Sequence, residues 1–174
     1  MITIIVGTNR ENSKSRKVAE YYGKLLESHG ATSQILDLRD LPVDFAFTAL
    51  YANTGKHEVF NEFVKIVNQS DKFVFIVPEY NGSFPGVLKT FIDGLDFPSS
   101  FQNKKAALLG ISSGVMGGAL ALSHLTDILN YLNMHVYGVK PRIQRMSVNF
   151  IDGIITDKFI ADLIDSQAKG FIEF

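Results

Sequence analysis

The chain has 174 residues, a formal net charge of -1 and no cysteine. This length fits one domain, residues 1–174, and the missing cysteine excludes disulfides and cysteine-ligated metals. The near-neutral charge, without long Lys/Arg runs, argues against nucleic acid or an anionic membrane as the main partner. No apolar run approaches the ~20 residues that a bilayer requires. Residues 1–7 are typical of a strand rather than a signal peptide, so we expect a cytoplasmic protein.

Short apolar runs alternate with segments of helical periodicity along the whole chain. We expect strands at 2–6, 33–38, 73–77, 106–111 and 135–139. Helices are expected to begin near residue 15, to cover 59–67, to follow Pro85, to cover 122–132 and to lie around 159–164. This alternation predicts an α/β fold, a parallel sheet with helices on both faces. At this length the common solution is the flavodoxin-like three-layer sandwich, a five-stranded sheet of order 2-1-3-4-5. Its ligand crevice lies where the loops after strands one and three meet.

The loop after the first strand has the features of an anion site. It carries three hydroxyl groups and a guanidinium just before a predicted helix: Thr8, Arg10, Ser13 and Ser15. The N–H groups and dipole of a helix N-terminus favour an anion such as a phosphate. The alternative is that the serines only cap the helix and that Arg10 is solvated. No Walker loop or G-x-G-x-x-G motif is present, so the loop favours a monophosphate such as FMN.

The loop after the third strand has the features of a ring-binding site. Its sequence is Pro78-Glu79-Tyr80-Asn81-Gly82. We expect exposed backbone N–H groups here, together with an aromatic face and an amide. An isoalloxazine ring needs a flat wall and donors near its carbonyl edge and N1. The alternative is an ordinary Pro/Asn/Gly turn with a locally packed tyrosine.

Together these loops resemble the NADPH-dependent FMN reductase family of flavodoxin-like proteins, which includes quinone, azo-dye and chromate reductases. The matching motifs are Gly7-Thr8-x-Arg10-x-x-Ser13-x-Ser15, then Pro78 to Ser83 followed by x-Pro85-Gly86-x-Leu88-Lys89. The likeness continues through Ser112-Ser113-Gly114-x-x-Gly117-Gly118 to Pro141-Arg142. It departs from the family at Ser15, where Asn is usual, and at Gly94, where Trp is usual.

The resemblance implies a set of cofactor-binding residues. Phosphate contacts would come from Thr8, Arg10, Ser13 and Ser15, ring contacts from Pro78, Glu79, Tyr80, Asn81 and Gly82, and closure of the pocket from Ser112, Ser113 and Gly114. It also implies a homodimer or homotetramer in which a neighbouring subunit helps to cover the flavin. The 14 phenylalanines and the mean hydropathy of +0.11 fit such an interface, or equally an unusually apolar core. In the long connection 39–57, Phe45, Phe47 and Tyr51 are candidates for flavin-covering or interface residues.

The implied activity is that of an FMN-dependent NAD(P)H oxidoreductase. NADPH or NADH would deliver hydride to flavin N5, and a small acceptor such as a quinone, an azo compound or free flavin would receive the electrons. The flavin performs the chemistry, so no catalytic side chain is predicted. The four histidines are scattered, so no metal site is predicted either.

Three other functions remain as alternatives. Two keep the fold: a flavodoxin-type electron carrier, and a regulatory FMN-binding protein. The third is a serine hydrolase, because Gly110-Ile111-Ser112-Ser113-Gly114 matches G-x-S-x-G after a strand. Its triad would need Asp127 and His135, which fall in a predicted helix and at a strand start rather than on loops.

Overall fold

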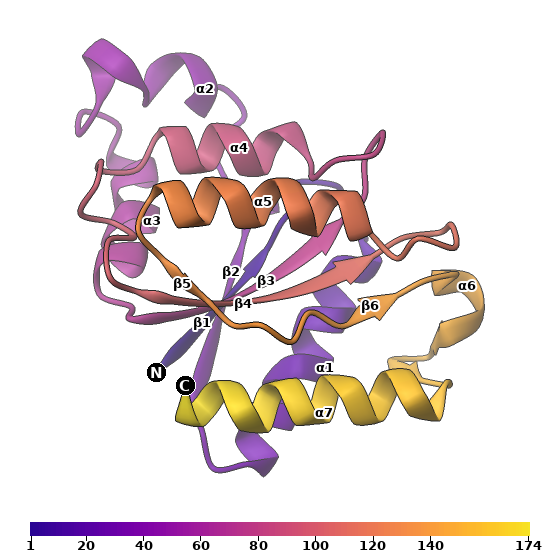
Figure 1. Cartoon of the computed structure of the whole chain (residues 1–174). Coiled ribbons are helices and arrows are strands. Elements are labelled where there is room, and N and C mark those ends of the chain that lie inside the picture. The colour runs from indigo at the N-terminus through magenta and orange to yellow at the C-terminus, as the bar shows by residue number, and fades with distance from the viewer.

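A parallel sheet with helices on both faces forms the body of the computed structural model, which describes all 174 residues (Figure 1). The strands are β1 (Ile2–Val6), β2 (Ser33–Asp37), β3 (Lys72–Pro78), β4 (Lys105–Ile111), β5 (His135–Val136) and β6 (Arg142–Ile143). They are ordered β2-β1-β3-β4-β5, and β6 also pairs with β4. The flavodoxin-like strand order predicted from the sequence is confirmed.

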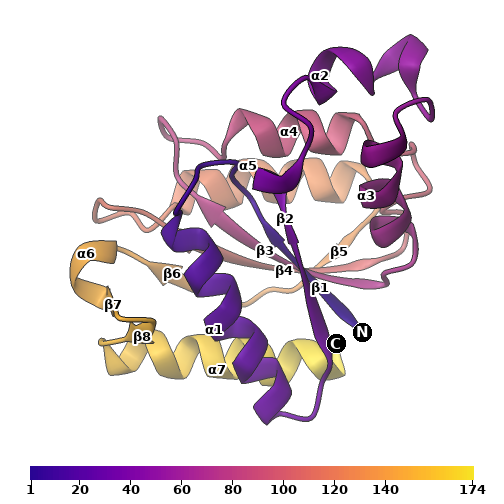
Figure 2. The same cartoon turned by 180° about the vertical axis from the view of Figure 1, so that it is seen from behind.

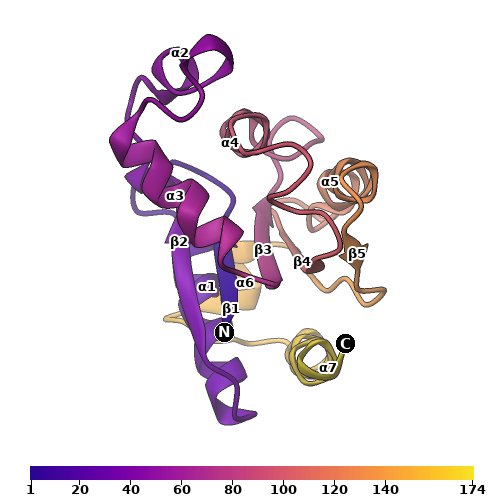
Figure 3. The ribbon, with the colours of Figure 1, turned by 90° about the vertical axis from the view of Figure 1, so that its left-hand side faces the viewer.

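Two layers of helices enclose this sheet (Figures 2 and 3). On one face lie α3 (Glu58–Asn68), α4 (Gly86–Asp93) and α5 (Ala119–Tyr131). On the other face lie α1 (Lys14–Ser28) and α7 (Lys158–Glu173). The connection between β2 and α3 contains η1 (Leu38–Asp40), α2 (Phe45–Thr48) and η2 (Tyr51–Asn53). No helix is long and apolar enough to cross a membrane.

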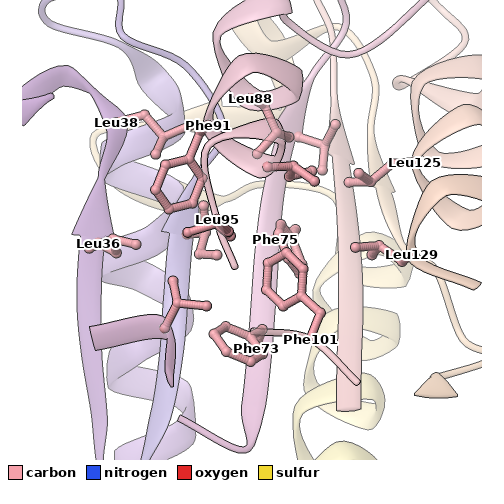
Figure 4. Packing of buried hydrophobic residues seen from close by; sticks show 14 of the residues in the cluster. Leu36, Leu38, Phe73, Phe75, Leu88, Phe91, Leu95, Phe101, Leu125 and Leu129 are labelled. Carbon is pink, nitrogen blue, oxygen red and sulfur yellow. The ribbon is translucent and has the colours of Figure 1, made fainter. Parts of the chain in front are cut away.

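The central strands are buried on both faces, which explains their unbroken apolar sequences. Side chains of β3 alternate between two cores, so that Phe73 and Phe75 face α4 and α5 (Figure 4). The opposite core contains Tyr22 of α1 and Phe171 of α7. Truncating one of these buried phenylalanines to alanine typically costs about 3–5 kcal/mol. The sheet is therefore a rigid support for the loops at its carboxyl edge.

The expected last strand, 135–139, begins where β5 begins but is too long, because β5 ends at Val136 and the chain pairs with β4 again only at β6, beyond the expected range. The carbonyl of Leu108 on β4 accepts a hydrogen bond from Nε2 of Gln167 at 2.9 Å, in place of a strand neighbour. The same Nε2 donates to the carbonyl of Val139 at 2.7 Å, and Tyr22 donates to Oε1 of Gln167 at 3.0 Å. A buried side chain of α7 thus fills the gap between the two short strands.

Residues 146–155 form structure that the sequence did not predict. The short helix α6 (Met146–Asn149) leads into a hairpin of β7 (Phe150–Ile151) and β8 (Ile154–Ile155). Its turn uses Asp152 and Gly153, both at positive φ (47° and 82°). Figure 1 shows α6 at the end of the molecule towards which the strands point. This segment therefore borders the edge where the ligand crevice is expected.

Gly94, where the family usually has Trp, is closely packed. A Cβ at this position would lie 2.7 Å from the ring of Phe60 on α3. The Phe60 ring in turn stacks on Phe45 with a centroid separation of 5.6 Å. An aromatic ring from α3 therefore occupies the space beside Gly94, and Phe45 is a core residue rather than a cover for a flavin.

Candidate functional site

A cleft of about 440 Å³ opens at the carboxyl edge of the sheet. It lies among the loops after β1, β3 and β4 and the start of α6. Nine of the twelve predicted site residues border it: Thr8, Arg10, Ser13, Ser15, Pro78, Glu79, Tyr80, Ser112 and Ser113. Asn81, Gly82 and Gly114 do not border it. Five residues outside the predicted set also border it: Glu11, Asn12, Lys14, Ile111 and Met146.

The loop after β1 directs hydrogen-bond donors at this cleft. Ser13 is the N-cap of α1, since its Oγ accepts from the N–H of Arg16 at 3.3 Å. The N–H groups of residues 11–15 make no hydrogen bond within the chain. Ser15 is only 2% exposed, yet its hydroxyl has no partner in the protein and borders the cleft. A row of unpaired donors at a helix N-terminus is a site for an anion such as a phosphate.

The charged side chains near this loop divide into paired and unpaired groups. Arg16 is paired with Glu20 at 2.9 Å and with Asp37 at 3.4 Å. The Glu20 hydrogen bond is the main cause of a raised pKa of Arg16, with Asp37 adding to it against the effect of burial. Arg10 has no ion pair, and Lys14 only donates to the carbonyl of Met146 at 3.0 Å. Arg10 and Lys14 are thus the cations available to an anion in the cleft.

The loop after β3 is a tight two-residue turn rather than an open loop. Asn81 and Gly82 both have positive φ (50° and 75°), as the turn of a short hairpin requires. The N–H of Tyr80 donates to Ser83, and that of Glu79 donates to the carbonyl of Ile111. Exposed N–H groups were expected throughout this loop, but only those of Asn81 and Gly82 remain without a partner.

Side chains hold this turn in place from two sides. The hydroxyl of Tyr80 lies 2.8 Å from Oγ1 of Thr8 on the first loop. On the other side, Oγ of Ser83 lies 2.9 Å from Nδ1 of His124 on α5. The ring of Tyr80, 38% exposed, therefore stands as a fixed flat wall of the cleft.

The loop after β4 forms the third wall and uses its own polar groups to keep its shape. Oγ of Ser112 donates to the carbonyl of Gly114 and accepts from the N–H of Gly117, both at 3.0 Å. Oε2 of Glu79 accepts from the N–H of Gly118 at 3.1 Å, which joins this wall to the loop after β3. The hydroxyl of Ser112 is therefore engaged in shaping the loop.

A serine hydrolase would need a histidine next to Ser112, and none borders the cleft. His124 is held by Ser83, and His135 begins β5 at the opposite edge of the sheet. The structure also contains no group of three His, Asp or Glu side chains that could share a metal ion. The arrangement thus favours a phosphorylated flat ligand over either of these chemistries.

Comparison with known proteins identifies the family. Its model, described as NADPH-dependent FMN reductase, matches residues 1–141. The chain belongs to the NADPH-dependent FMN reductase family. As a member of it, the protein is an oxidoreductase with FMN as cofactor and NAD(P)H as co-substrate. The family match ends before α6, so the hairpin and α7 lie outside it.

Individual relatives agree with this assignment. A quinone reductase of Pseudomonas putida is 32% identical over 136 residues, which are 76% of this chain and 71% of the relative. The solved structure of FerB, a flavoenzyme NAD(P)H:(acceptor) oxidoreductase from Paracoccus denitrificans, superimposes with a TM-score of 0.79 at 25% identity, covering 99% of this chain and 94% of FerB. A flavodoxin from the domain Archaea has a TM-score of 0.65 at 15% identity, covering 99% of this chain and 97% of the flavodoxin, which shows the shared fold alone.

Proposed function

We propose that this family member passes electrons from NAD(P)H to a quinone, with FMN held in the cleft at the carboxyl edge of the sheet. The observation that carries this proposal is the row of unpaired N–H groups at residues 11–15 beside the unpaired hydroxyl of Ser15. These donors suit the phosphate of FMN, and the wall of Tyr80 suits its ring. The quinone acceptor is supported by the quinone reductases among the relatives.

The residues that border the cleft differ in their proposed roles toward FMN. Ser15, Arg10 and the free N–H groups would bind the phosphate, and Lys14, which was not among the predicted site residues, would add a second positive charge. Thr8 would act mainly as a tie, because its hydroxyl contacts Tyr80 and accepts from the N–H of Arg10. FMN, when bound, supplies hydride transfer between nicotinamide and acceptor, so the side chains only need to bind and orient.

We further propose that residues 1–174 form one domain and that two or four copies assemble. The single domain is supported by α7, which lies outside the family match yet packs on α1 and β4. Assembly is supported by an apolar groove of about 430 Å³ between α4 and α5. At its rim Phe97 and Tyr131 are 70% and 76% exposed and stack at 6.4 Å. A cytoplasmic location is supported by the use of NAD(P)H.

The visible spectrum of the purified protein tests this function. We expect flavin absorption bands, either as purified or after addition of FMN and removal of the excess. Anaerobic NADPH should bleach the bands, and a quinone should restore them. A colourless protein that does not take up FMN would refute the proposal. Bound FMN that NADPH cannot bleach, but a reduced protein donor can, would instead show an electron carrier.

A further inference from the structure

A second depression lies next to the cleft, on the side of β2. It has a volume of about 250 Å³, and none of its lining side chains is apolar: Arg10, Asn12, Ser13, Arg16, Lys17, Glu20, Asp37 and Arg39. Arg10, Asn12 and Ser13 also border the cleft, so the loop 10–13 is the wall between the two cavities. We call this cavity the β2-side depression.

The β2-side depression has more positive than negative charge. Its two carboxylates, Glu20 and Asp37, are both paired with Arg16. Asp37 also accepts from the backbone N–H of Arg39 at 3.0 Å, which fixes Arg39 at the rim. The Lys17 side chain makes no ion pair, and Arg39 only reaches Asp40 at 3.5 Å, outside the depression. Guanidinium and ammonium groups without apolar lining suit a phosphate monoester rather than a base or a ring.

The order of the strands places this depression in line with the proposed flavin site. The ring loop follows β3, the phosphate loop follows β1, and the depression lies at the end of β2. In the sheet these strands are neighbours in the order β3, β1, β2. A nicotinamide stacked on the flavin, with its phosphates running beside the FMN phosphate, would bring its adenosine ribose to the β2 side.

We infer that the β2-side depression binds the 2′-phosphate of NADPH, and that Lys17 and Arg39 make the enzyme prefer NADPH to NADH. The inference rests on the proposed function, because it requires the nicotinamide to lie on FMN in the cleft. NADH carries a hydroxyl where NADPH carries this phosphate, so it cannot use the two cations in the same way. Arg10, which borders both cavities, is shared with the FMN phosphate and is not a specific determinant of the coenzyme.

Substitution of the two cations tests the inference in the FMN-loaded protein. We expect Lys17→Ala and Arg39→Ala each to raise the KM for NADPH about tenfold, as expected for one charge-assisted hydrogen bond. The KM for NADH, the kcat values and the dissociation constant of FMN should not change. Lys24→Ala is the matched control, because Lys24 is exposed, lies two turns further along α1 and borders neither cavity.

Calorimetry gives a readout that does not depend on turnover. Adenosine 2′,5′-bisphosphate should bind the FMN-loaded wild-type protein and should bind at least about tenfold more weakly to the Lys17→Ala/Arg39→Ala double variant. AMP, which lacks the 2′-phosphate, should not distinguish the two proteins. An equal rise in the KM values of NADPH and NADH, or a weaker affinity for FMN in the double variant, would overturn the inference. Failure of the wild-type protein to bind FMN would instead refute the proposed function.

Discussion

The hydroxyl of Tyr80 lies 2.8 Å from Oγ1 of Thr8, although 72 residues separate them in the sequence. This contact joins the loop after β3 to the loop after β1 across two neighbouring strands. Thr8 is 1% exposed and Tyr80 is 38% exposed, so the contact lies where the protein interior meets the cleft. The two halves of the proposed flavin site are therefore held at a fixed spacing by side chains as well as by the sheet.

Tyr80→Phe should weaken FMN binding about fivefold, since one hydrogen bond contributes about 0.5–1.5 kcal/mol. The aromatic ring remains in this variant, so any loss of FMN affinity is due to the lost hydrogen bond to Thr8. Quenching of FMN fluorescence on titration measures the dissociation constant. Tyr131→Phe is the control, because Tyr131 is exposed at the end of α5 and borders no part of the cleft. Identical dissociation constants for Tyr80→Phe and wild type would show that the hydrogen bond between Tyr80 and Thr8 does not contribute to FMN binding.

Replacement by alanine should lower FMN affinity at Ser15 and the stability of the fold at Ser13. Ser15→Ala should weaken FMN binding about tenfold or more and leave riboflavin binding and stability unchanged, because its hydroxyl has no partner in the protein. Ser13→Ala should lower the free energy of unfolding by about 1 kcal/mol through loss of the N-cap. Parallel FMN and riboflavin titrations, with urea denaturation, measure both effects. Equal losses of FMN and riboflavin affinity in Ser15→Ala would show that Ser15 does not contact the phosphate.

Ser112→Ala should lower FMN affinity only modestly, about two- to fivefold, since its hydroxyl shapes the loop through bonds to Gly114 and Gly117. Ester hydrolysis should be absent in the wild-type protein as well as in the variant. An assay with short-chain aryl esters, beside the NADPH oxidation assay, checks both statements. Wild-type esterase activity that disappears in Ser112→Ala would support the hydrolase alternative.

Stability should fall at alkaline pH because of Tyr22. Burial raises the pKa of Tyr22 above its ordinary value of 10.0, with a smaller contribution from Tyr137. Above about pH 10 the unfolded chain releases this proton while the folded protein keeps it, so a rise in pH favours unfolding. Tyr22→Phe should be about 1–3 kcal/mol less stable at neutral pH, because Gln167 loses its donor. Its stability should nevertheless decline less steeply above pH 10.

Urea denaturation of Tyr22→Phe and wild type at several pH values from neutral to alkaline measures this difference in slope. Tyr51→Phe is the control, since Tyr51 is 84% exposed. If the free energy of unfolding fell equally steeply with pH in Tyr22→Phe and wild type, another group would be responsible for the loss of stability above pH 10.

The strand order was predictable because each βα unit has a strong local signal, such as the apolar run of β3 or the leucine spacing of α5. The last strand was not, because its interruption depends on Gln167, a polar residue almost thirty positions later whose burial has no local signal. The hairpin after α6 was also missed. Its strands have two residues each, which is too short for any periodicity.

The cleft could be located from sequence for the same topological reason, and nine of the twelve predicted residues do border it. Their roles toward FMN remain predictions. Lys14 could have been recognised as a cation at the start of a helix that follows an anion loop. Met146 could not, because it reaches the cleft from the unpredicted α6. An Asn-Gly pair is typical of a tight two-residue turn, so the positive φ angles of Asn81 and Gly82 could have been predicted from the sequence. The prediction used only the side-chain amide of Asn81.

The division of the last strand also determines how the sheet ends. β5 and β6 form one edge of the sheet, with only two residues each. The carbonyls of Leu108 on β4 and of Val139 both accept from the Gln167 amide, so this side chain replaces a strand-to-strand hydrogen bond between β5 and β6. Two strands of two residues each give an incoming strand little to pair with, so edge-to-edge aggregation is disfavoured at this edge of the sheet. The opposite edge is β2 (Ser33–Asp37), a five-residue strand that pairs only with β1, so it offers an incoming strand a longer partner than β5 or β6 does.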